Sequence, residues 1–104
     1  MKREEFLIQT DNVRVRVMEL LPGDATPWHF HQEVVDHLVG LTGVILVRLK
    51  QPEVMVELQP GQRYTVEVGR GHQVANGSPS EPASYLLIQG VGRYDFNNID
   101  SNLK

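Results

Sequence analysis

Hydrophobic and polar residues alternate along much of this chain, in short segments separated by turns that contain glycine or proline. Residues 13–20 (VRVRVMEL) show the pattern most clearly, with valine at every second position of their first half. Because successive side chains of a strand point to opposite faces, this segment predicts a strand with one buried face. Arg14 and Arg16 would then form a charged row on its solvated face. Similar patterns predict strands at 28–31, 34–41, 44–49, 53–58, 64–68, 72–75 and 84–91.

These segments indicate an all-β fold. Strands recur about every 8–12 residues, and no segment shows a convincing 3.6-residue period of an amphipathic helix. The expected architecture is therefore an antiparallel sandwich or closed barrel of about eight or nine strands. A small, mostly dry pocket is expected inside it, lined by apolar side chains on the inward face: Val39, Leu41, Leu46, Val74, Leu86 and Ile88.

Composition narrows the class of protein. The 104 residues suit one domain, residues 1–104, and a net charge of −3 with scattered basic residues argues against nucleic-acid binding. The absence of cysteine, of a leader-like N-terminus and of a long apolar run predicts a cytoplasmic protein that does not bind a membrane. The polar tail, 93–104, is expected to be a docked or frayed end with four apolar anchors: Tyr94, Phe96, Ile99 and Leu103.

Candidate chemistry centres on histidine. His29 and His31 are one residue apart, so on an extended segment both imidazoles lie on one face, as a divalent metal requires. Asp36 has the opposite parity and can join them only if the chain reverses near 32–34. Glu33 shares the parity of the two histidines and is the rival carboxylate if the strand runs on.

Two motifs place these residues in a larger pattern. The first, about residues 23–43, begins and ends with glycine. Five residues separate its opening glycine from His29, one residue lies between His29 and His31, and four lie between His31 and Asp36. Six more residues then lead to the closing glycine.

The second motif, about residues 61–76, follows after a stretch that predicts a short strand hairpin. Five residues separate its opening glycine from Glu67, and His72 and Asn76 come after it. In both motifs the order and spacing resemble those of the cupin family. The departures from the family pattern are Asp36, where the family usually has Glu, and Glu67, where it usually has Pro.

The resemblance to a small single-domain cupin implies a jelly-roll antiparallel β-barrel, a double-stranded β-helix, with one metal bound inside. By correspondence of the motifs, the implied metal ligands are His29, His31, Asp36 and His72. Three imidazoles and a carboxylate suit a divalent transition metal: Mn, Fe, Ni, Co or Zn. They leave one or two coordination positions open for a substrate or O₂.

Two functions fit such a site. The first is a metal-dependent enzyme of the dioxygenase, decarboxylase or isomerase type, whose partner is a small oxygenated molecule. The second is a non-catalytic module that binds or senses a small ligand or a metal. No catalytic residue is assigned; the candidates for a general base are Glu33, Glu67, Tyr64 and Tyr85. Small cupins are commonly dimers, so a homodimer is expected, through residues 6–9 and the apolar strand 84–91.

Several residues near the motifs are expected to lie outside the site. Trp28 and Phe30 alternate with the histidines and therefore face away from them, toward packing or a dimer contact. His37 follows Asp36 and must face the surface or an interface. Glu67 alternates with two valines and is expected to face solvent, and Asn76 is expected to fix the turn after His72.

Overall fold

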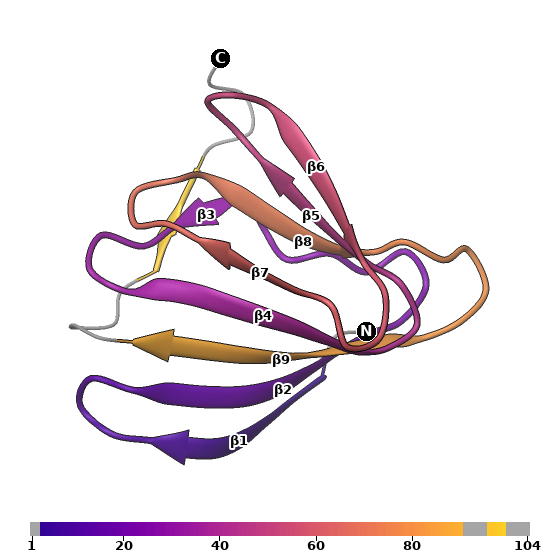
Figure 1. The fold of residues 1–104 in the computed structure, drawn as a ribbon, viewed down its shortest axis with the longest axis horizontal. Helices are drawn as coiled ribbons and strands as arrows, with labels where there is room; N and C mark the ends of the chain where they lie inside the picture. Colours follow the sequence, from indigo (N-terminus) through magenta and orange to yellow (C-terminus); the bar gives the residue numbers. More distant parts are fainter. Residues whose placement is uncertain (1–2, 91–95, 100–104) are drawn as a thin grey trace.

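The computed structural model describes residues 3–90 and 96–99, and every regular element in them is a β-strand (Figure 1). The strands are β1 (Arg3–Gln9), β2 (Arg14–Leu20), β3 (His29–Phe30), β4 (Val35–Thr42), β5 (Ile45–Leu49), β6 (Val54–Leu58), β7 (Arg63–Val66), β8 (His72–Asn76), β9 (Ala83–Gly90) and β10 (Asn97–Asn98). Tyr94 and Leu103, two of the expected tail anchors, lie outside the described residues. Within the described part of the chain, no helix is long and apolar enough to cross a membrane.

The strands form two five-stranded sheets that face each other in a jelly-roll sandwich (Figure 1). One sheet has the order β1-β2-β9-β4-β7 and the other the order β10-β3-β8-β5-β6, with neighbouring strands antiparallel. Leu20, Leu38, Ile45 and Val47 are fully buried between the sheets and form the centre of the core with the ring of Tyr85. The expected all-β class is confirmed.

The valines of β2 suggest that its odd-numbered positions face the core, but the opposite face of the strand is the buried one. Its even positions point inward, so Met18 joins the core and Arg16 is buried beside it, while Arg14 is half-buried. Antiparallel pairing with β9 explains this choice, because it sets Met18 opposite the buried Tyr85. The prediction that Arg16 lies on a solvated face is therefore wrong. Its charge is balanced by an ion pair with the partly exposed carboxylate of Glu4.

The predicted pocket lining is corrected for the same reason. Val74 is buried, as expected. Leu86 and Ile88 instead lie on the outer face of β9, because Tyr85 and Gln89 take the inward positions of that strand. The other three predicted lining residues are also half-buried or exposed, at outward positions of β4 and β5: Val39, Leu41 and Leu46. The inner face therefore carries more polar groups than a dry apolar pocket would.

One turn at each end of the sandwich fixes a loop by hydrogen bonds: Gly69 lies at the end where the histidines lie, and Asn76 at the opposite end of β8. Gly69 has a φ of +77°, which glycine adopts without strain, and its N–H donates to the carbonyl oxygen of His31 at 2.7 Å. Asn76 fixes the turn after β8, as expected, because its Nδ2 donates to the carbonyl oxygens of Leu20 at 3.0 Å and Glu81 at 2.8 Å. The loop that carries His31 is thus tied to the loop between β7 and β8, and the turn at the far end of β8 is tied to the end of β2.

Candidate metal centre

Three strands and one loop bring the four predicted ligands together between the sheets. His29 on β3 and His72 on β8 are paired neighbours in one sheet, and His31 follows directly after β3. The chain then crosses to the facing sheet, where Asp36 points inward from β4. This is the reversal that the parity of Asp36 requires. All four side chains are buried, and their candidate ligand atoms lie within 4.8 Å of one another.

The spacing of the donor atoms suits a metal ion. Asp36 Oδ2 lies 3.0 Å from His72 Nε2 and 3.2 Å from His31 Nε2. Ligand atoms bound at about 2.1 Å and at right angles to each other are about 3 Å apart, which matches both distances. Opposite ligands would be about 4.2 Å apart, so the most distant pair must approach slightly when an ion binds. Metal ligation by these four residues stays a prediction that the geometry supports.

Backbone carbonyls fix the tautomers of two of the histidines. His29 Nδ1 donates to the carbonyl oxygen of Pro27 at 2.7 Å, and His72 Nδ1 donates to that of Arg70 at 2.9 Å. Because a carbonyl can only accept, each Nδ1 carries the proton and each neutral ring keeps a lone pair on Nε2. When the His72 ring is neutral, its Nε2 and Asp36 Oδ2 face each other as two acceptors 3.0 Å apart, a contact that a shared proton or a metal cation relieves. Histidine ligands of metals are usually oriented by such second hydrogen bonds.

Burial and hydrogen bonding together set the protonation states of His29 and Asp36. Burial, with a further contribution from the nearby His72, lowers the pKa of His29 from 6.5 to about 4, so this ring is neutral at pH 7. Burial alone would raise the pKa of Asp36, but hydrogen bonds from His31 and His72 outweigh it. The pKa of Asp36 is therefore lowered below its usual range, and the carboxyl is ionised. A neutral imidazole and an anionic carboxylate are the forms that metal ligation requires.

Behind the site lies a polar network that sequence reasoning missed. Gln89 Nε2 donates to Asp36 Oδ1 at 2.9 Å and lies 3.3 Å from His31 Nε2. The amide oxygen of Gln89 accepts from Arg16 Nη2, and Arg16 Nη1 lies 3.0 Å from Glu4 Oε2. Because a guanidinium can only donate, it fixes the orientation of the Gln89 amide. The available signal was Gln89 itself, a polar side chain near the end of the mostly apolar strand β9.

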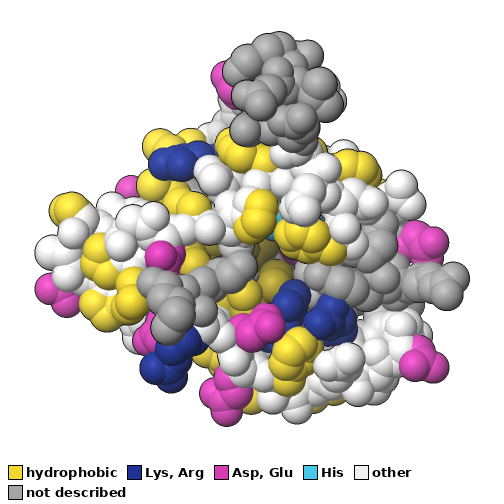
Figure 2. All heavy atoms as spheres, turned by 180° about the vertical axis from the view of Figure 1, so that it is seen from behind, with side chains coloured by type: hydrophobic (Ala, Val, Ile, Leu, Met, Phe, Trp, Pro, Cys, Tyr) yellow, Lys and Arg dark blue, Asp and Glu magenta, His cyan; other side chains and the backbone are white. Residues whose placement is uncertain are grey.

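The candidate site opens into a cavity of about 70 Å³ between the sheets. His29 and Asp36 line this cavity together with Arg16 and Gln89. Phe96, from the segment just before β10, stacks on the His29 ring with the two centroids 4.3 Å apart. Figure 2 shows that this side of the molecule is hollowed, with basic and acidic side chains next to each other beside the hollow.

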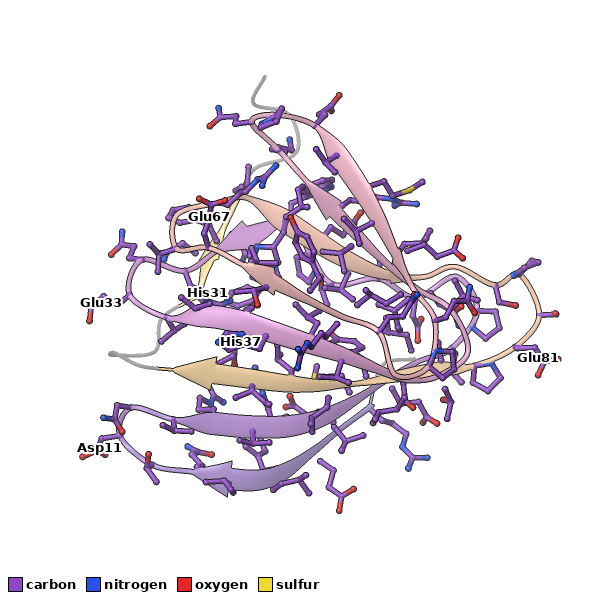
Figure 3. The ribbon with its side chains drawn as sticks, in the orientation of Figure 1. Asp11, His31, Glu33, His37, Glu67 and Glu81 are labelled. Atoms are coloured by element: carbon purple, nitrogen blue, oxygen red, sulfur yellow. The ribbon has the colours of Figure 1, made fainter. Side chains whose placement is uncertain are left out.

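Other candidates from the sequence lie away from the four buried residues (Figure 3). Glu33 is exposed and points outward from the loop between β3 and β4, so the carboxylate beside the histidines is that of Asp36. His37 is exposed on β4, as its parity predicts, and Glu67 is exposed on the loop after β7. Trp28 faces a separate pocket on the surface. None of these four lines the cavity.

Comparisons with known proteins agree with this architecture. The family model described as a cupin domain matches residues 16–89. The solved structure of a protein with a double-stranded β-helix domain from Klebsiella pneumoniae superposes with a TM-score of 0.82 at 19% sequence identity. That match covers 96% of this chain and 85% of the other.

Two further solved structures share the fold. A cupin 2 domain-containing protein from Halorhodospira halophila gives a TM-score of 0.82 at 21% identity, covering 96% of this chain and 70% of that protein. A polyketide cyclase from Streptomyces resistomycificus gives a TM-score of 0.81 at 23% identity, covering 98% and 73%. No curated protein matches the sequence. The family match over most of the chain, on a double-stranded β-helix fold, shows that this chain belongs to the cupin family.

Proposed function

We propose that this cupin is a metal-dependent enzyme that transforms a small oxygenated molecule. The observation that carries the proposal is the convergence of four buried donors, three imidazoles and one carboxylate, beside an internal cavity. A set of nitrogen and oxygen donors without sulfur suits a divalent Mn, Fe, Ni, Co or Zn ion. Four protein ligands leave one or two positions of a five- or six-coordinate ion for the substrate.

The chain supplies the conditions for this chemistry. A bound ion would act as a Lewis acid or redox centre beside the substrate. The three histidines present imidazole nitrogen donors, and Asp36 brings a compensating negative charge that Gln89 holds in place. Phe96 covers the His29 ring and limits the access of bulk water from that side. These residues hold and shield the site, and no proton-transfer step is assigned to any of them.

Metal analysis of the purified protein tests the proposal. After reconstitution we expect about one transition-metal ion per chain, measured by elemental analysis, because the four donors form one site. His72→Ala should abolish this uptake, whereas His37→Ala, which removes an exposed histidine from the outer face of β4, should not. Circular dichroism should show that both variants keep the fold. A wild type that takes up no metal, or a His72→Ala variant that stays fully loaded, would contradict the site.

A non-catalytic module that binds a small ligand is the second candidate, and Tyr85 favours it. Burial and the nearby charge of Asp36 raise the pKa of this cavity residue, so its hydroxyl stays protonated and cannot serve as a base near pH 7. Among the described residues that line the cavity, Glu4 offers the one carboxylate that is not a candidate ligand. Turnover of a bound molecule by the metal-loaded protein supports the enzyme, and binding without turnover supports the module.

A further inference from the structure

We infer that Arg16 recognises a carboxylate group of the ligand, and that the ligand is a small carboxylate with a second oxygen donor. This inference rests on the proposed metal site and specifies its substrate class. Arg16 enters the cavity from β2, and its side chain is only 9% exposed. A guanidinium in such a place binds carboxylates well, because its planar donors match the two oxygens of the group.

Glu4 is a partner that a ligand can displace from Arg16. Its Oε2 lies 3.0 Å from Arg16 Nη1, but its side chain is 44% exposed and belongs to β1, the edge strand of its sheet. Water can therefore solvate the Glu4 carboxylate when it moves away, whereas Arg16 stays hydrogen-bonded to Gln89 inside. The Glu4 carboxylate thus marks the position that the carboxylate of a ligand would take.

One side chain connects this position to the candidate metal site. Gln89 accepts from Arg16 through its amide oxygen and donates to Asp36 Oδ1 at 2.9 Å through its amide nitrogen. A single carboxamide group therefore separates the guanidinium from a metal ligand, and both side chains face the same cavity. A ligand whose carboxylate bonds to Arg16 can place a hydroxyl or keto oxygen near the four donors.

Charge and size lead to the same class of ligand. A divalent ion and Arg16 would bring three positive charges to the cavity, and once Glu4 has moved away only Asp36 among the described lining residues brings a negative one, so the site favours an anionic ligand. The cavity volume of about 70 Å³ limits the ligand to a small molecule, since one water molecule takes about 30 Å³ in the liquid. Hydroxy acids and oxo acids of the size of lactate meet both conditions.

Isothermal titration calorimetry of the zinc-loaded protein with lactate and lactamide tests the inference. The two probes have nearly the same shape, but only lactate is charged. We expect lactate to bind about tenfold to a hundredfold more tightly, because its carboxylate forms charge-assisted hydrogen bonds with Arg16. Arg16→Met, which keeps an unbranched apolar stem, should remove most of this preference.

Two further variants separate recognition from folding. Arg14→Met is the matched control, because Arg14 lies on the same strand and also packs over the Phe6 ring, but does not line the cavity. Its affinity for lactate should equal that of the wild type. Glu4→Gln should raise the affinity for lactate about two- to fivefold, because it removes a competing charge from Arg16. Misfolding cannot produce such a gain.

The zinc content of every sample, measured by elemental analysis, separates this inference from the proposed function. A wild type that takes up no zinc contradicts the metal site. A fully loaded wild type that binds neither probe, or binds both equally, overturns the assignment of Arg16 and leaves the metal site standing. The same holds if fully loaded Arg16→Met still prefers lactate as strongly as the wild type does.

Discussion

His29 makes the stability of the metal-free protein depend on pH. Burial and the nearby His72 lower its pKa in the folded state to about 4, against 6.5 for an ordinary histidine. Between these values the unfolded chain binds more protons than the folded chain, so stability falls as the pH drops through this window. The full difference between these two pKa values corresponds to about 3 kcal/mol in the free energy of unfolding. Urea denaturation of EDTA-treated protein should therefore give a lower free energy of unfolding at pH 4 than at pH 7, by up to this amount.

Two substitutions test whether His29 is the group that causes this loss of stability. His29→Asn should flatten the loss between pH 6.5 and 4, whereas His37→Asn, at an exposed position of β4, should leave it unchanged. Asp36 acts with the same sign at lower pH, because its lowered pKa gives stability that is present above 3.8 and is lost as the pH falls further. If the stability of His29→Asn kept the full pH dependence above pH 4, a group other than His29 would cause the loss of stability in acid.

The four candidate ligands could be predicted from the sequence because the spacing of the two motifs resembles that of the cupin family, and this resemblance implies the full set. His29 and His31 share a face on any extended segment, and the parity of Asp36 correctly required a reversal before it. Arg16 could not be placed in the same way. It alternates with valines, and alternation alone does not say which face is buried. Its inward direction follows from the pairing of β2 with β9, a contact between residues more than 60 positions apart.

For whole strands, too, the sequence pattern alone does not determine which face is buried. The alternation of hydrophobic and polar residues predicts the positions of β2 to β9 along the chain. It predicts the wrong inward face where both faces of a strand are apolar. In β9, Leu86 and Ile88 are as apolar as the buried Tyr85 and Leu87, so their direction depends on the facing sheet. For β1 the sequence indicates only residues 6–9, as part of an expected dimer contact, and the pairing of β1 with β2 is interrupted by a bulge. β10 has only two residues, too few for a pattern.

The turn between β4 and β5 depends on a glycine. Gly43 has a φ of +68°, and a Cβ added there would lie 2.6 Å from the carbonyl oxygen of Pro82. Gly43→Ala must therefore strain its own backbone and also displace that of a neighbour. We expect it to lower the free energy of unfolding by about 2–4 kcal/mol, measured by urea denaturation.

Gly61→Ala is the matched control for this effect. Gly61 has a φ of +87°, but nothing lies within 4 Å of an added Cβ. Its replacement should therefore cost about 1 kcal/mol, from backbone conformation alone. Equal losses in the two variants would show that the close approach of Pro82 has no effect on stability.

At the scale of the whole molecule, the outer face of one sheet is apolar. Val15 and Val17 on β2, and Leu86 and Ile88 on β9, point away from the core and are half-buried. An antiparallel sheet that faces water usually carries polar residues on its outer side. Ile8, on the neighbouring edge strand β1, is 53% exposed and pairs with Val15 in the sheet. This apolar face continues to the edge of the sheet and favours contact with another protein surface.

We propose that two copies of the chain pack these faces together across a two-fold axis. Light scattering should then give twice the 11.8 kDa mass of the chain. Ile8→Lys should produce monomers, because symmetry brings two charges into an interface that the apolar residues keep free of water. Met55→Lys is the matched control, since Met55 is 63% exposed but lies on β6 in the other sheet. A wild type with the mass of one chain, or a dimer that Ile8→Lys does not weaken, would contradict this arrangement.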